Sequence, residues 1–186
     1  MEMKTLKIAS LAFLVVGLTA CSGELKWKTD KNTGFYEIDV PERMTMTDQL
    51  HAEASTQYEY VEQVGDVVKE NYLIVLMETK ESISQLDLGF EFDALTYSEL
   101  SIQALEGGLA TSEILTKQPK VESVNGMDCV EVDMEGNAGG IDVFYKIGVF
   151  EGEKAFYQVV TWTLLDQKEE FMPIMEKMIA SFKETK

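Results

Sequence analysis

Two β-rich runs, IDVFYKIGVF (residues 141–150) and AFYQVVTWTL (residues 155–164), stand close together near the end of the chain. Aromatic and β-branched residues alternate along both runs, which is typical of strands whose successive side chains point to opposite faces of a sheet. The polar segment Glu151-Gly152-Glu153 joins them. The pattern therefore predicts an antiparallel β-hairpin.

Further strands are predicted earlier in the chain. Residues 35–40 alternate in polarity and stop at Pro41, which cannot donate a hydrogen bond to a sheet ladder. Residues 56–62 and 72–79 are two more β-rich runs, and Gly65-Asp66 is the expected turn between them. The middle of the second run is continuously apolar, as in a central strand that is covered on both faces.

The pair Asn125-Gly126 predicts a second hairpin, with residues 120–124 and 127–134 as its strands. A type I′ turn needs positive φ at both central residues, and Asn and Gly adopt such angles more readily than other residues. Three glycines fall within residues 136–140, so we expect a flexible loop there.

Two helices are predicted. The first covers residues 94–106, because Thr96 and Glu99 have the spacing of a capping box and Gly107-Gly108 ends the run. The second lies at the end of the chain, starts near Asp166 and Glu169, and becomes regular near Phe171 because Pro173 lacks a backbone donor. Its apolar residues recur on one side of a helix: Phe171, Ile174, Met175, Met178, Ile179 and Phe182.

The start of the chain has the parts of a secretory signal. Lys4 and Lys7 precede an apolar run that ends in Leu18-Thr19-Ala20-Cys21. Residues 8–20 number 13, fewer than the roughly 20 that a membrane-spanning helix needs. The last four residues resemble the cleavage box of bacterial lipoproteins, which implies removal of residues 1–20 and attachment of lipid to Cys21. The alternative is simple secretion, with Cys21 an ordinary thiol.

This leader divides the chain into three parts: a signal peptide (1–20), the lipidated Cys21 with a tether (21–32), and one domain (33–186). The tether contains Trp27 between Lys26 and Lys28. Trp27 could sit at the level of the lipid headgroups, or Leu25 and Trp27 could belong to a first edge strand.

Charge excludes one class of partner. The chain has 16 basic and 33 acidic residues, and loss of Lys4, Lys7 and Glu2 with the leader leaves 14 and 32, a net charge of −18. Such a surface repels phosphate backbones, so nucleic acid is not expected as a partner. It also disfavours broad electrostatic adhesion to anionic lipid, and it attracts cations and basic partners instead.

Cys129 is the second cysteine, and it has no disulfide partner if Cys21 carries lipid. Acidic and apolar residues alternate around it, which predicts a half-buried strand with Cys129 on the same face as Met127 and Glu131. A nucleophilic cysteine needs a nearby base, and the single histidine, His51, is distant in sequence. We therefore expect no catalytic role for Cys129.

Residues 131–142 copy the oxygen spacing of a calcium-binding EF-hand loop, with Glu131, Asp133, Glu135 and Asp142 at positions 1, 3, 5 and 12 and Gly136 at position 6. The flanking residues are β-rich, whereas that motif needs helices. We interpret the acids as the solvated face of a strand and assign no metal. No cofactor-binding or catalytic motif is present, and no carboxylate pair can be chosen without geometry.

The order of elements is similar to that of the PsbP-like family, named for an extrinsic protein of photosystem II, whose relatives include small bacterial lipoproteins. Residues 35–41, 71–80 and 154–182 carry the resemblance. It implies an α+β fold in which an antiparallel β-sheet is packed between helices, an α/β/α sandwich. It implies little about activity, because members act as scaffolding or accessory subunits.

The sequence thus predicts a lipoprotein of the cell envelope, anchored by lipid on Cys21 and facing the periplasm or exterior. We expect a non-catalytic binding or accessory module for an envelope protein, without catalytic, cofactor or metal residues. The alternatives are a small-molecule or cation-binding lipoprotein and, less favoured, a hydrolase that uses carboxylates. The target membrane, inner or outer, is left open.

Overall fold

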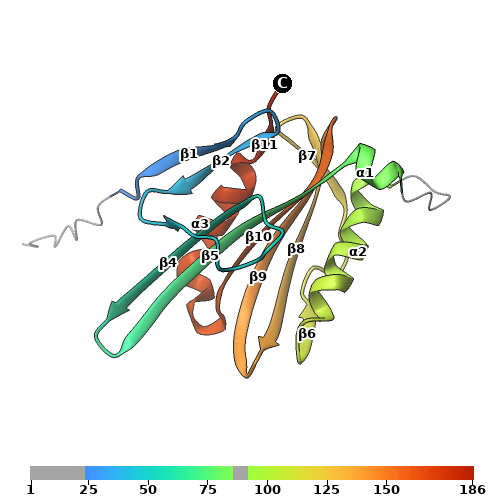
Figure 1. Ribbon diagram of the computed structural model, residues 1–186. Coiled ribbons are helices and arrows are strands. Elements are labelled where there is room, and N and C mark those ends of the chain that lie inside the picture. The colour runs from blue at the N-terminus through green and yellow to red at the C-terminus, as the bar shows by residue number, and fades with distance from the viewer. Residues whose placement is uncertain (1–23, 86–91) are drawn as a thin grey trace, which may run out of the picture.

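The computed structural model describes residues 24–85 and 92–186 (Figure 1). The predicted signal peptide and Cys21 lie outside these residues. The main sheet has the order β3-β4-β5-β10-β9-β8-β6, with β7 also paired to β8. Its strands are β3 (Thr45–Met46), β4 (Thr56–Val64), β5 (Val67–Thr79), β6 (Thr111–Ile114), β7 (Val121–Val124), β8 (Met127–Ala138), β9 (Ile141–Glu151) and β10 (Ala155–Leu164).

A second sheet of three strands has the order β1-β2-β11. It consists of β1 (Trp27–Asn32), β2 (Tyr36–Pro41) and β11 (Lys183–Glu184), and the helices are α1 (Lys80–Ser84), α2 (Ala94–Glu106) and α3 (Lys168–Ser181). No helix in the described ranges is both long and apolar enough to span a bilayer.

The β9–β10 hairpin lies near the middle of the main sheet, as predicted. β10 pairs with β9 on one side and with β5 on the other, so that Val159 lies opposite Gly148 and Val75. Alternate residues of β5 face opposite sides: Leu73 and Val75 belong to one apolar cluster and Ile74 to another. The prediction of a central strand covered on both faces is therefore confirmed.

Helices cover the two faces of the main sheet differently (Figure 1). Helix α3 and the three-stranded sheet pack over one face, in a cluster that includes Tyr36, Phe150, Met175 and Phe182. Helix α2 packs over β8, β9 and β10 on the other face, where Tyr97 contacts Phe156 at a ring-centroid distance of 4.6 Å. This layering confirms the predicted α+β architecture.

The predicted type I′ hairpin is present between β7 and β8, with φ of 51° at Asn125 and 84° at Gly126. The turn also has a tertiary role that the sequence does not reveal. The side-chain amide of Asn125 donates hydrogen bonds to the carbonyl oxygens of Ala180 and Phe182, both at 2.9 Å. The hairpin thereby satisfies backbone acceptors at the end of α3, which a helix leaves unpaired.

Both predicted helices exist, but their first turns differ from expectation. The N-cap of α2 is Asp93, whose carboxylate accepts a hydrogen bond from the Thr96 backbone at 2.7 Å, so Thr96 is not the cap. Helix α3 begins at Lys168, between the predicted start residues Asp166 and Glu169, and it is regular from there and not only from Phe171. Pro173 lies on the exposed side of α3, where the backbone group that it leaves unpaired can be hydrated.

Two boundaries also need correction, and one strand was not predicted. Residues 27–32 form β1 and pair with β2, so the domain reaches back at least to Trp27 and the tether is shorter than residues 21–32. The edge-strand interpretation of Trp27 was right. Strand β8 continues to Ala138, which limits the predicted 136–140 loop to Gly139-Gly140. Strand β6 was not predicted, because its four residues are all exposed and show no alternation.

Phe182 joins the layers of the core. It is fully buried, and its ring centroid lies 4.7 Å from that of Phe150, 5.1 Å from that of Tyr36 and 5.2 Å from that of Tyr157. These partners come from β9, β2 and β10. The side chain that follows α3 therefore contacts both sheets.

We predict that Phe182→Ala lowers the free energy of unfolding by about 3–5 kcal/mol, because it removes a buried aromatic ring and leaves a cavity. The control is Ile141→Ala at a side chain that is 55% exposed, where a change below about 0.5 kcal/mol is expected. Urea denaturation measures both. Equal losses in the two variants would contradict this role for Phe182.

Candidate functional site

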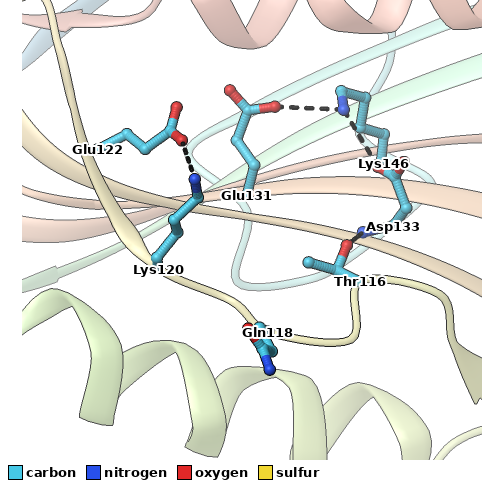
Figure 2. A pocket seen from close by; sticks show the side chains of 7 residues that line it. All are labelled: Thr116, Gln118, Lys120, Glu122, Glu131, Asp133 and Lys146. Carbon is cyan, nitrogen blue, oxygen red and sulfur yellow. Dashed lines mark hydrogen bonds and ion pairs between the residues drawn. The ribbon is translucent and has the colours of Figure 1, made fainter.

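The edge of the main sheet opens between β6 and β7. Both strands pair with β8, but the segment between them, residues 115–120, leaves the ladder after the Leu115 backbone donates to the Asp133 carbonyl at 2.9 Å. The Asp133 backbone then donates to the hydroxyl of Thr116. The opening leaves a polar pocket of about 270 Å³ (Figure 2). Its lining residues are Thr116, Gln118, Lys120, Glu122, Glu131, Asp133 and Lys146.

Lys146 lies at the base of this pocket. Its ammonium is 3.1 Å from Asp133 and 3.2 Å from Glu131, and only 9% of its side chain is exposed. β9 places Lys146 directly opposite Asp133 on β8, and Glu131 is two residues away on the same face. Burial by itself would lower the lysine pKa, but the two carboxylates outweigh burial and the pKa is raised. Lys146 is therefore a charged, structurally held group.

The pocket mouth is much looser than its base. Lys120 and Glu122 are 3.5 Å apart with side chains 79% and 65% exposed. An ion pair this exposed contributes little to stability. The exposed pair at the mouth is therefore held more weakly than the Lys146 group, and Figure 2 shows the two sets of contacts.

The residues with EF-hand spacing are held by other side chains. Glu131 and Asp133 contact Lys146, Glu135 pairs with Lys168 at 3.2 Å, and Asp142 accepts a hydrogen bond from Asn137. They follow two extended strands, β8 and β9, and do not converge on one point. Within the described ranges, no three acidic, histidine or cysteine side chains come together in a way that could hold a metal ion. These acids belong to strands, as interpreted, but their face is only partly solvated, because Asp133 and Glu135 are 30% and 31% exposed and pair with lysines.

Cys129 is more buried than predicted, with 1% of its surface exposed. β8 turns its side chain into the cluster beneath α3, on the predicted face with Met127 and Glu131, but Cys129 is covered whereas Glu131 remains exposed. Burial raises the pKa of the thiol to about 12, helped by the negative charges of Glu131 and Glu122. His51 lies in the segment before β4, where its Nδ1 accepts a hydrogen bond from the Glu53 backbone. Cys129 has the properties of a structural thiol, not of a nucleophile.

A second, more apolar cavity of about 280 Å³ lies on the opposite face of the same opening. Val132 of β8 forms its base, because alternate residues of a strand face opposite sides. Residues at helical spacing on α2 form one wall, and Ile114 and Pro119 form the other. The complete lining is Leu95, Ser98, Glu99, Ile102, Glu106, Ile114, Pro119 and Val132. We call it the α2 cavity.

Sequence reasoning missed both parts of this site. One signal for the pocket was present: Lys146 is a single charged residue within the apolar run VFYKIGVF, and such a residue needs a partner. No pattern indicates the α2 cavity, since it depends on how residues 115–120 leave the sheet edge.

No family model and no curated protein sequence matches the chain. Solved structures do. Cyanobacterial PsbP (CyanoP) from Synechocystis sp. PCC 6803 is 12% identical, with a TM-score of 0.61 over 91% of this chain and 99% of that one. The fold is PsbP-like.

Two other solved structures share the PsbP-like fold. LpqN of Mycobacterium tuberculosis, described as involved in cell envelope biogenesis, has a TM-score of 0.56 at 12% identity and covers 88% of this chain and 92% of its own. The Pseudomonas aeruginosa protein PA94, of unknown function, has a TM-score of 0.53 at 11% identity, with coverage of 83% and 94%. At these identities the likeness concerns the fold alone.

We predict that Cys129 of the PsbP-like domain is inert to thiol reagents at pH 8 and reacts once guanidinium unfolds the chain. Because the folded state holds the thiol proton more tightly than the unfolded chain, Cys129 also lowers stability as the pH rises from about 9 toward 12. Ellman's assay with and without denaturant measures reactivity. Rapid labelling of the folded protein would contradict this prediction.

We predict that Lys146→Met costs about 2 kcal/mol of stability, because it leaves Glu131 and Asp133 without their cation. These carboxylates are partly exposed and can be hydrated, so the cost falls below that of a fully buried pair. Lys120→Met is the matched control at the exposed pair, with an expected change below about 0.5 kcal/mol. Thermal unfolding compares the two variants. Equal melting temperatures for Lys146→Met and Lys120→Met would refute the structural role of Lys146.

Proposed function

We propose that the protein is a lipid-anchored lipoprotein of the cell envelope that acts as a non-catalytic binding module for another envelope protein. The leader with its cleavage box at Cys21 supports the anchor. The likeness to LpqN, a protein involved in cell envelope biogenesis, is compatible with this location. The binding role has its support in the α2 cavity.

The α2 cavity is the single observation that carries the binding role, because it joins three features that a peptide partner can use. Its base is apolar, its helical wall carries Glu99 and Glu106, and β6 ends the sheet beside it with four exposed residues. An edge strand can accept an extended segment through main-chain hydrogen bonds, and a neighbouring cavity can then accept an alternate side chain.

The expected partner segment is extended, with an apolar side chain that enters the α2 cavity and basic residues on either side of it. Glu99 and Glu106 favour such cations, and the net charge of −17 attracts basic partners over a longer range. Ile114, which lines the cavity and is 41% accessible, extends the apolar contact toward the surface.

The described groups favour binding over chemistry. A hydrolase that uses carboxylates would need two acids free to meet a substrate, whereas Glu131 and Asp133 of the polar pocket are both paired with Lys146. The polar pocket also does not favour the cation-binding alternative, because the Lys146 ammonium already occupies the position between Glu131 and Asp133.

The test is in-cell photocrosslinking of the full lipoprotein with a crosslinking residue at Ile114. We expect capture of one envelope protein, and loss of that capture in Glu99→Lys/Glu106→Lys, because the cations repel a basic segment. Glu169→Lys/Glu176→Lys on α3 is the matched control with the same change of charge and should retain capture. Palmitate labelling of wild type and Cys21→Ser checks the anchor separately.

The two halves of the proposal fail in different ways. Absence of label on wild type would remove the lipid anchor. Capture that is equally strong in both charge-reversal variants would remove the α2 cavity as the binding site.

A further inference from the structure

The outer face of the three-stranded sheet combines one tryptophan with exposed lysines. Trp27 and Lys31 alternate with inward-facing residues along β1, while β2 and β11 place Glu37 and Lys183 beside them. Lys177 of α3 reaches the same face, with its ammonium 4.1 Å from the centroid of the Trp27 ring. We call this surface, made of Trp27, Thr29, Lys31, Glu37, Asp39, Lys177 and Lys183, the basic face.

The cations are the exposed groups of the basic face. The side chains of Lys31 and Lys183 are 67% and 51% exposed and lie 3.0 and 2.6 Å from Glu37, whose side chain is only 16% exposed. Asp39 accepts a hydrogen bond from Thr29 at 2.6 Å. A partner that approaches this face meets ammonium groups, because the carboxylates are already engaged beneath them.

The basic face also differs in charge from the rest of the mature chain. Its three lysines and two acids sum to +1, which leaves 11 basic and 30 acidic residues, a net charge of −19, elsewhere. An anionic surface therefore attracts this face and repels the others. The domain as a whole is therefore not expected to adhere to anionic lipid. Only an orientation with the basic face toward the lipid is electrostatically favourable.

The anchor brings this face close to lipid. Trp27 lies six positions after Cys21, and a fully extended segment of six residue steps spans about 21 Å. Figure 1 shows that β1 and β2 lie at the outside of the molecule. A lipid on Cys21 thus holds Trp27 and its lysines within reach of the headgroups.

We infer that the basic face docks on the membrane surface and binds anionic lipid headgroups, with Lys31, Lys177 and Lys183 as the phosphate contacts and Trp27 at the interface. This inference rests on the lipid attachment of the proposed function. Trp27 is suited to this place because it is only partly buried and presents an apolar ring beside cations. The short tether from Cys21, the exposed lysines and the Trp27 ring all favour the basic face as the surface that meets the membrane.

The two tryptophans allow a direct test with the lipidated chain in vesicles. Trp162→Phe leaves Trp27 as the reporter, and Trp27→Phe leaves Trp162, which stacks on Tyr72 at 5.0 Å on the α2 side of the main sheet. We expect brominated lipid to quench Trp27 more strongly in phosphatidylglycerol than in phosphatidylcholine vesicles. Trp162 should stay unquenched in both.

Neutral variants test the lysines. Lys31→Gln/Lys177→Gln/Lys183→Gln should lower the docking equilibrium on phosphatidylglycerol by about fivefold per lysine, because each cation near an anionic surface contributes by roughly that factor. Lys177→Gln alone keeps both ion pairs of Glu37, so its effect does not depend on the fold of the small sheet. Lys117→Gln/Lys120→Gln, at the far edge of the main sheet, is the control and should have no effect.

The outcomes separate the two proposals. Vesicle-bound protein with Trp27 unquenched, or with both tryptophans quenched equally, overturns the docking of the basic face and leaves the anchor intact. Quenching that is equal in both lipids overturns the role of the lysines. Wild-type protein that washes off the vesicles as readily as Cys21→Ser overturns the anchor and this inference together.

Discussion

The close approach of α3 to β9 is the contact on which the rest of the structure depends, and it requires a glycine. A Cβ at Gly148 would lie 2.7 Å from the Ile179 methyl group and 2.8 Å from the Phe150 ring. Because Gly148 has no Cβ, α3 packs directly on β9. The end of α3 then places Phe182 among three aromatic rings and allows β11 to pair with β2. The second sheet is therefore assembled by a helix that packs on the first.

Buried and exposed lysines have different roles in this domain. Lys146, the cation in the middle of the sheet, is paired with two carboxylates and serves the structure. The lysines of the basic face are exposed and are able to meet a partner. The same residue type thus has different roles, because a buried ammonium must be compensated internally whereas an exposed one is hydrated until a ligand replaces the water.

The proposed lipid-binding face and the proposed protein-binding cavity lie on different sides of the domain. The three-stranded sheet and α3 lie on one side of the main sheet and α2 on the other (Figure 1). The α2 cavity is on the α2 side, at the β6 edge. A domain held at the membrane by its basic face would present the cavity away from the lipid. This arrangement suits an accessory module, in which the anchor limits orientation and the opposite side recruits a partner.

Local patterns in the sequence were sufficient for the elements that local physics controls. Alternation predicted β2, β9 and β10, a continuously apolar run predicted β5, and Asn125-Gly126 predicted its turn, because these signals act within a few residues. The bounds of α2 were predicted correctly, but its cap is Asp93 and not Thr96. The helix α3 is regular from Lys168 and not only from Phe171, because tertiary packing stabilises the turn before Pro173. Tertiary structure alone decided the burial of Cys129, the pairing of Lys146 with Glu131 and Asp133, the α2 cavity and the basic face. Each of these joins residues that are separated along the chain, and the free energy of such contacts depends on packing, which no short stretch of sequence contains.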